Sequence, residues 1–191
     1  MKRVLFVYYS NTGQTETILQ NMIRPIREND QVEVVVQKLS PRKAFPYPWK
    51  FLTFFNAMPD AVGEEGCELE ELAIRGSERF DLIVLCYPIW FLSVATPMMA
   101  FLKSPAAGIL RNTEVITIVT CRNMWIKGQE RMQYHLKRLQ AKLVGNVVYR
   151  DRSGNKPITF VSTPLWLLTG KKSVSAFIPE AGIDPKLVSA A

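Results

Sequence analysis

Three stretches of the chain are almost continuously apolar and rich in β-branched residues. They run from Lys2 to Tyr9 (KRVLFVYY), from Phe80 to Tyr87 (FDLIVLCY) and from Glu114 to Cys121 (EVITIVTC). Such runs are typical of strands that are buried on both faces of a parallel sheet. Two less apolar runs, Gln31 to Lys38 (QVEVVVQK) and Asn146 to Arg150 (NVVYR), predict a second and a fifth strand.

Helical periodicity separates these strands. Apolar residues recur at helical spacing from Thr15 to Arg27, where Pro25 kinks or ends the last turn, and further helices are predicted over 96–103 and 126–143. Because strands and helices alternate, we expect right-handed βαβ units. The predicted fold class is α/β, with a doubly wound parallel sheet of five strands and helices on both faces.

The segment from Ala44 to Pro59 (AFPYPWKFLTFFNAMP) is unusually aromatic for a connection between strands. One interpretation is a helix between the second and third strands, laid on the sheet, with the prolines shaping its approach. The other is an apolar lid or wall over a ligand, or a contact between two subunits. The residue pattern leaves both interpretations open.

The last segment, residues 151–191, does not continue the alternation. We expect a turn at 153–155, a returning strand from Pro157 to Val161 and a short apolar segment from Pro164 to Gly170. A regular terminal helix is not indicated. The segment is therefore predicted to be an irregular C-terminal extension packed on the same domain.

Composition narrows the class of protein. The 191 residues carry 24 Lys and Arg against 17 Asp and Glu, a formal net charge of +7, and 48% of them are apolar. These values predict one ordinary globular domain without disorder. No apolar run approaches the roughly 18–20 residues of a membrane helix and no signal peptide is evident, so we expect a cytoplasmic protein without a membrane span. Three cysteines without CxxC spacing and a single histidine argue against disulfides and against a metal site.

The strongest chemical signal lies between the first strand and the first helix, where the sequence reads SNTGQT. A phosphate here would meet unpaired backbone N–H groups and the positive end of the helix dipole. The loop lacks both the lysine of a nucleoside triphosphate site and the GxGxxG of a dinucleotide site, which favours a monophosphate. The alternative is an ordinary helix cap. The candidate residues are Ser10, Asn11, Thr12, Gly13, Gln14 and Thr15.

Two further loops follow the third and fourth strands and reach the same carboxyl edge of the predicted sheet. The first is rich in aromatic residues, and the second offers an arginine and an amide as hydrogen-bond donors. Their candidate residues are Pro88, Ile89, Trp90, Phe91, Leu92, Cys121, Arg122 and Asn123. Cys121 ends a buried strand and is interpreted as a small core residue in preference to a nucleophile, so the catalytic residues stay unknown.

The letters YYSNTGQT resemble the (S/T)-x-T-G-x-T phosphate loop of the flavodoxin family, and the resemblance extends in element order over residues 1–150. It implies a flavodoxin-like domain that binds flavin mononucleotide (FMN), a strand order of 2-1-3-4-5, and residues 151–191 as an extension of that domain. The first loop would hold the FMN phosphate. The other two loops would contact the flavin ring.

The loop after the third strand is also similar to that of flavodoxin-like NAD(P)H:quinone reductases, with Pro88, Trp90, Pro97, Phe101 and Leu102 matching. Those enzymes usually carry a glycine near Leu92 or Ser93, which this chain lacks. The resemblance implies an FMN-dependent oxidoreductase that passes electrons from NADH or NADPH to a quinone or another flat apolar ring substrate.

Three sequence blocks, FPYPW, CRNMW and FVSTPLWLLTGKK, together resemble bacterial flavodoxin-like proteins described as dialkylresorcinol condensing enzymes, over nearly the whole chain. A condensing enzyme needs an acyl-carrying nucleophile and bases, which the sequence does not offer. This resemblance therefore favours a redox step on a hydrophobic ring substrate.

Charge is unevenly distributed along the chain. Residues 60–81 hold eight acids and two bases, whereas residues 111–175 hold twelve bases and three acids. Flavodoxins that carry electrons usually have acidic surfaces that dock on basic partners. A net charge of +7 departs from that pattern and favours an enzyme or an acidic partner. A basic stripe that includes His135 is expected on the surface of the helix at 126–143, without a nucleic-acid recognition motif.

Two other functions stay open from the sequence. One is an electron carrier or accessory flavoprotein without its own NAD(P)H site, and the other is a non-enzymatic binding module that has lost the flavin. The aromatic segment and the tail suit a homodimer in which each subunit walls the other's site. They suit a closed monomer equally well.

Overall fold

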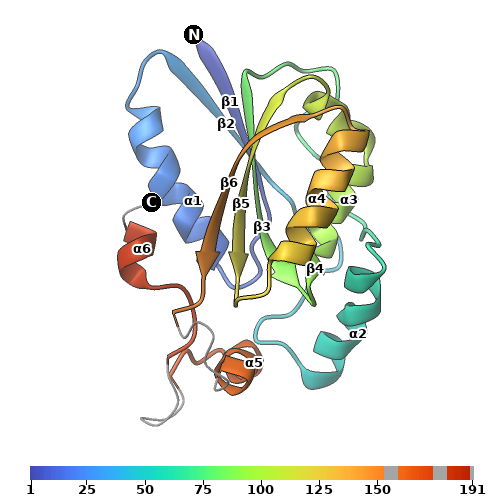
Figure 1. Ribbon diagram of the computed structural model, residues 1–191, viewed down its shortest axis with the longest axis vertical. Helices are drawn as coiled ribbons and strands as arrows, with labels where there is room; N and C mark the ends of the chain where they lie inside the picture. Colours follow the sequence, from blue (N-terminus) through green and yellow to red (C-terminus); the bar gives the residue numbers. More distant parts are fainter. Residues whose placement is uncertain (153–158, 174–179, 190–191) are drawn as a thin grey trace.

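The computed structural model describes residues 1–152, 159–173 and 180–189, and a parallel sheet of five strands forms its centre (Figure 1). The strand order is β2-β1-β3-β5-β6, and a short strand β4 pairs antiparallel with the end of β3. The strands are β1 Lys2–Tyr8, β2 Val32–Lys38, β3 Leu82–Trp90, β4 Ser93–Val94, β5 Glu114–Cys121 and β6 Lys142–Arg150. The predicted fold class and strand order are confirmed.

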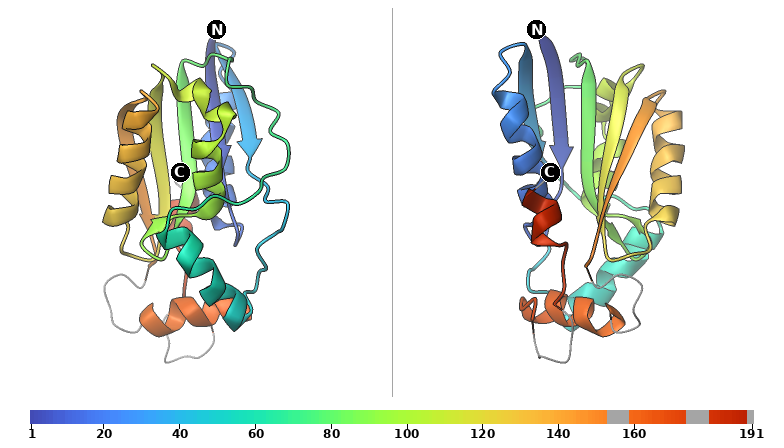
Figure 2. Two further views of the ribbon diagram at one scale, coloured as in Figure 1. Left: turned by 90° about the vertical axis from the view of Figure 1, so that its right-hand side faces the viewer. Right: turned by 60° about the vertical axis from the view of Figure 1, so that its left-hand side comes forward.

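Helices cover both faces of this sheet (Figure 2). Helix α1 lies on one face with the short α6 beside it, and α3 and α4 lie on the other face. Helices α2 and α5 lie instead at the end of the molecule where the strands terminate (Figure 1). The helices are α1 Gln14–Arg27, α2 Phe51–Val62, α3 Thr96–Lys103, α4 Ile126–Arg138, α5 Thr159–Thr169 and α6 Pro185–Ser189, with a 3-10 turn η1 at Pro105–Leu110.

Alternation along β1 builds a separate core on each side of the sheet. Leu5 and Val7 point into the cluster formed with α3 and α4, whereas Val4 and Phe6 point into the cluster formed with α1. Because both sets are buried, the strand reads as continuously apolar instead of alternating. The sheet is thus held from both sides, which fixes the loops at its carboxyl edge.

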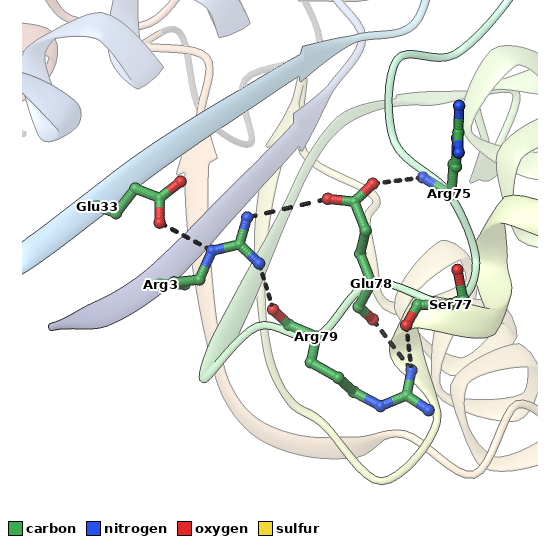
Figure 3. Close-up of polar contacts among 6 residues, drawn as sticks. All are labelled: Arg3, Glu33, Arg75, Ser77, Glu78 and Arg79. Carbon is green, nitrogen blue, oxygen red and sulfur yellow. Dashed lines mark hydrogen bonds and ion pairs between the residues drawn. The ribbon is translucent and has the colours of Figure 1, made fainter.

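The amino edge of the sheet is tied together by Arg3 (Figure 3). Its Nε lies 2.8 Å from the carboxylate of Glu33 on β2, and its Nη1 donates to the carbonyl of Arg79 at 2.9 Å. Glu78 lies 3.9 Å from the same guanidinium and accepts a hydrogen bond from the Arg75 N–H. These groups are about a third exposed, so each ion pair contributes little stability, but together they position the chain entering β3.

The boundary between α4 and β6 differs from the prediction of one helix over 126–143. Helix α4 ends at Arg138, Gln140 has a φ of 59°, and the Ala141 N–H returns to the carbonyl of Leu136. This is a helix stop that usually employs glycine, and no glycine marks it in the sequence. Leu143, expected in the helical core stripe, pairs instead with Val115 in the sheet.

The C-terminal extension is more regular than predicted. Residues 159–161, expected as part of a strand, begin helix α5, and α6 follows near the end of the chain. The expected turn at 153–155 and the first residues of that strand lie outside the described residues. The apolar segment from Pro164 belongs to α5, because it has no partner strand and instead covers other apolar side chains at the carboxyl edge.

His135 is not at the surface as expected. Its side chain is 12% exposed, and its Nε2 lies 2.7 Å from Glu64 just after α2. Arg131, one turn earlier on α4, approaches the same carboxylate at 3.0 Å. Two residues of the predicted basic stripe therefore contact Glu64, an acid of the acidic segment 60–81.

Among the described residues, none of the helices is long and apolar enough to cross a membrane.

Candidate functional site

A cavity of about 370 Å³ opens at the carboxyl edge of the sheet, where the loops after β1, β3 and β5 converge. Its size lies within the range of about 300–1,000 Å³ that is usual for small-molecule sites. The cavity is lined by Asn11, Thr12, Gln14, Thr15, Trp49, Phe54, Pro88, Ile89, Trp90, Phe91, Leu92, Thr120, Cys121, Arg122, Asn123, Met124, Asp151, Thr163, Pro164, Trp166 and Leu167. All of the predicted site residues except Ser10 and Gly13 are among them.

The end of the cavity beside α1 is polar. Gly13 precedes the helix with a φ of 79°, a conformation that favours glycine, and no side chain caps the helix. The first N–H groups of α1 are therefore left without the side-chain acceptor that helix ends usually have. Ser10 lies behind this loop, and its buried hydroxyl has no hydrogen-bond partner among the described residues. The local arrangement suits an anion such as a phosphate.

Two predicted residues of this loop make hydrogen bonds within the protein. The hydroxyl of Thr15 lies 2.8 Å from that of Thr120 at the end of β5. With its amide oriented to satisfy both ends, Asn11 accepts from the indole N–H of Trp49 at 2.8 Å and donates to the carbonyl of Phe45 at 3.2 Å. Both residues thus line the cavity while connecting the first loop to its neighbours.

The turn between β3 and β4 accounts for the missing glycine. Ile89 pairs with Val94 and Trp90 with Ser93, so Phe91 and Leu92 form a two-residue hairpin turn. Both turn residues have positive φ, 49° and 67°, as a type I′ turn requires. These angles are normally supplied by glycine or asparagine, so the backbone stores strain here, a feature that clusters at functional sites.

Aromatic rings surround Trp90 and form one wall of the cavity. The ring of Trp90 lies 4.9 Å from Phe45, 5.4 Å from Trp49 and 5.6 Å from Tyr9, each in an edge-to-face arrangement. Phe54 at the start of α2 reaches Phe91 of the turn at 4.9 Å. The aromatic segment 44–59 therefore contains a helix, as one interpretation expected, but this helix lies at the end of the molecule and not on the sheet. The segment also supplies Trp49 and Phe54 to the wall of the cavity, as the other interpretation expected.

Helix α5 closes the opposite side, and sequence reasoning missed its part in the site. The Trp49 N–H donates to the carbonyl of Leu167 at 2.8 Å, and Tyr47 lies edge-on to Trp166 at 6.4 Å. Thr163, Pro164, Trp166 and Leu167 line the cavity from this helix. The available signal was an uncharged run from Thr159 to Thr169, which reads equally well as a core segment.

Within the described ranges of the chain, two charged residues line the cavity, Arg122 on the third loop and Asp151 directly after β6. Asp151, also unforeseen, is 5% exposed, and its carboxylate accepts from the Gly182 N–H, which ties the extension to the end of β6. Burial lowers the pKa of Arg122, and the nearby Asp151 carboxylate opposes that change. Burial raises the pKa of the Cys121 thiol to about 12, so this cysteine stays protonated and is a poor nucleophile near neutral pH.

Comparisons with known proteins agree with this architecture. No family model matches the chain, and no curated protein matches it. A flavoprotein from Lactobacillus acidophilus solved in complex with FMN superposes with a TM-score of 0.58 at 17% identity, covering 78% of this chain and 93% of that one. A protein from Bacteroides uniformis described as a flavoprotein gives a TM-score of 0.60 at 14% identity, covering 87% and 97%.

The protein has a flavodoxin-like fold. The strand order changes direction between β1 and β3, and in flavodoxin-like folds ligands bind outside the carboxyl ends of the strands at this switch point. The cavity of this flavodoxin-like chain lies there. Because the identities are below 20%, these similarities establish the fold and not the ligand.

Proposed function

We propose that this cavity binds FMN and that the protein is an FMN-dependent oxidoreductase. The observation that carries the proposal is the uncapped start of α1, which meets the cavity at Thr12, Gln14 and Thr15. The buried hydroxyl of Ser10, at the beginning of the same loop, has no partner among the described residues. A phosphate would satisfy the Ser10 hydroxyl and the free N–H groups together. Among the described residues, no lysine lines the cavity, which suits a monophosphate held by N–H and hydroxyl groups in preference to a triphosphate.

The remainder of the cavity fits a flat aromatic ring system. Pro88, Trp90 and Phe91 line it from the hairpin, and Trp166 lines it from α5. These side chains would bury the faces and edges of a planar ring, while Arg122 and Asn123 stand beside it as hydrogen-bond donors. FMN, when bound, supplies the ability to accept a hydride from NADH or NADPH and to pass two electrons to an acceptor.

The chain's own residues contribute binding, orientation and exclusion of water. Helix α5 and the aromatic wall keep the cavity largely apolar, which favours a quinone or another flat ring substrate over a charged acceptor. The raised pKa of Cys121 supports a mechanism without a thiolate nucleophile. Holding the nicotinamide and then the acceptor in the right orientation against the flavin ring would supply most of the rate acceleration.

The chain also resembles proteins described as dialkylresorcinol condensing enzymes. Under this proposal, that resemblance is better explained by oxidation of a ring substrate than by a condensation. In the described part of the chain, the side chains around the cavity include no thiolate or activated hydroxyl that would carry an acyl group. A hydrophobic cyclohexanedione would suit the same apolar cavity, and its oxidation to an aromatic ring would release two electrons and two protons, which bound FMN would accept and pass on to an acceptor such as a quinone.

The test begins with the absorption spectrum of freshly purified protein and a fluorescence titration with FMN. We expect flavin bands or a saturable one-to-one binding curve, followed by oxidation of NADH or NADPH when a quinone is added. A protein that binds no FMN overturns the cofactor. A protein that binds FMN but oxidises neither nicotinamide with any quinone overturns the reductase and leaves an accessory flavoprotein.

A further inference from the structure

Exposed apolar side chains gather at the end of the molecule that holds the cavity. Eight of the fourteen large hydrophobic residues that are exposed in the described part of the chain come from residues 51–58 of α2, from α5, from the first residue of α4 and from the loops beside the cavity. Phe51 and Leu52 are the most exposed of those on α2, at 62% and 73%. We call this set the apolar end, and it comprises Phe51, Leu52, Phe55, Met58, Leu92, Met124, Ile126 and Val161.

The apolar end is formed mainly by two helices, and the segment just before α2 contacts α5 and the residue that follows it. Helices α2 and α5 lie together beyond the carboxyl ends of the strands (Figure 2). The Trp49 N–H bonds to Leu167, and Gly170 approaches Pro48 so closely that an added Cβ would lie 2.8 Å from the proline ring. These contacts therefore hold in place the part of the surface that carries the exposed residues of α2. They belong to no core cluster of the described residues.

Positive charge predominates around the apolar end, although Asp60 in α2 and Glu130 on α4 are exposed acids close to it. Residues 44–58 and 159–173 contain no aspartate or glutamate, and their charged residues are Lys50, Lys171 and Lys172, all exposed. Lys127 adds a further exposed positive charge next to Ile126. Of the acids that follow α2, Glu64 pairs with α4 and Glu65 lies 3.5 Å from Lys103.

We propose that the apolar end docks on an anionic lipid bilayer. Aromatic and aliphatic side chains flanked by lysines are the composition of surfaces that lie in the interface of a membrane, where apolar groups enter the acyl boundary and lysines meet the headgroups. A second copy of the chain is a poorer occupant. A two-fold contact through this face would bring its lysines toward those of the partner, and the exposed acids Asp60 and Glu130 offset them only in part.

Docking in this orientation would place the cavity next to the bilayer. Leu92 and Met124 belong both to the apolar end and to the cavity lining, so the mouth of the cavity opens on the docked face. Given the proposed function, an apolar ring acceptor dissolved in the bilayer would then enter the site without crossing water. Binding of the protein to lipid does not depend on it.

The experiment is vesicle co-sedimentation of the full chain, with vesicles of phosphatidylcholine alone and of phosphatidylcholine containing phosphatidylglycerol. We expect binding to the anionic vesicles that weakens as salt is raised. Leu52→Glu should reduce the fraction bound at least tenfold, because a leucine that enters the acyl region is replaced by a charge that cannot. Leu187→Glu, the same change at an exposed leucine of α6, should leave binding unchanged.

Three results would overturn the inference. The first is wild-type protein that stays in the supernatant with both kinds of vesicle. The second is equal loss of binding in the Leu52→Glu and Leu187→Glu variants. The third is a wild-type dimer in size-exclusion chromatography that Leu52→Glu converts to a monomer without any vesicle binding, since that assigns the surface to a second copy. None of these readouts needs FMN or enzyme activity, so failure of the proposed function leaves the outcome interpretable.

Discussion

Thr15 and Thr120 are 105 residues apart in the chain, and their hydroxyl groups lie 2.8 Å apart in the buried base of the cavity. Thr15 stands in the first turn of α1, and Thr120 stands near the end of β5. The bond therefore joins the first loop of the site to the third. It fixes the distance between the polar end of the cavity and the loop that carries Arg122.

Replacing Thr15 with valine tests this link. The variant keeps the shape of the side chain but leaves the Thr120 hydroxyl buried without its partner, which should lower the free energy of unfolding by about 1–3 kcal/mol. Urea unfolding measures the change. The double variant Thr15→Val/Thr120→Val should recover part of the loss, because no unpaired hydroxyl remains. A fully additive double variant would contradict the link.

The placement of a phosphate at Thr12 gives a second prediction. Thr12→Asp puts a negative charge on the cavity lining at the start of α1, where it should repel the phosphate and reduce FMN affinity at least a hundredfold. Gln20→Glu adds the same charge at an exposed position further along α1 and should leave affinity unchanged. Both variants should unfold at the same denaturant concentration as the wild type. Unchanged FMN affinity in Thr12→Asp would refute the phosphate position.

The strained hairpin turn predicts that a substitution by glycine stabilises the protein at this position, although glycine usually lowers stability. Leu92 has a φ of 67°, a conformation that costs a side-chain-bearing residue about 1–2 kcal/mol. Leu92→Gly should therefore raise the free energy of unfolding or leave it unchanged. Leu52→Gly, at an exposed position inside α2, should lower it by about 1 kcal/mol. If both variants lose equal stability, the turn does not have the left-handed conformation described.

Cys121 provides a prediction for alkaline pH. Its pKa in the folded protein is about 12, above an unfolded value of 9.0, chiefly because of burial. A raised pKa of this kind contributes stability that is complete below pH 9 and is lost as the pH rises toward 12. Wild-type stability should fall more steeply than that of Cys121→Ala across this window. Parallel curves for the two proteins would contradict the shift.

The same shift can be checked by chemical labelling at Cys121. Iodoacetamide at pH 7 should modify this thiol in folded protein at least about a hundredfold more slowly than an exposed cysteine, because the thiolate fraction is correspondingly smaller. Mass spectrometry of the digested protein locates the modified residue. Rapid modification of Cys121 before unfolding would instead indicate a reactive thiol in the site.

Local sequence determined the elements that build the sheet and the loops that surround the cavity. A strand buried on both faces leaves an apolar run in the sequence, and parallel strands bring their carboxyl ends to one edge, so Thr12, Trp90 and Arg122 were predicted near one another. Both rules depend only on residue order. For this reason the parallel sheet and most of the cavity lining could be predicted, and the strand order followed from the resemblance to the flavodoxin family.

Tertiary packing decided the remainder. Helix α4 stops at a left-handed Gln140 without a glycine, since Leu143 gains more by pairing with Val115 in the sheet than by extending the helix. Helix α5 exists because its uncharged face covers the cavity and meets Trp49, a contact between segments more than a hundred residues apart. Non-local burial of this kind leaves no periodic signal in a short apolar segment, so the closed site and the apolar end beside it emerge only when the chain is folded.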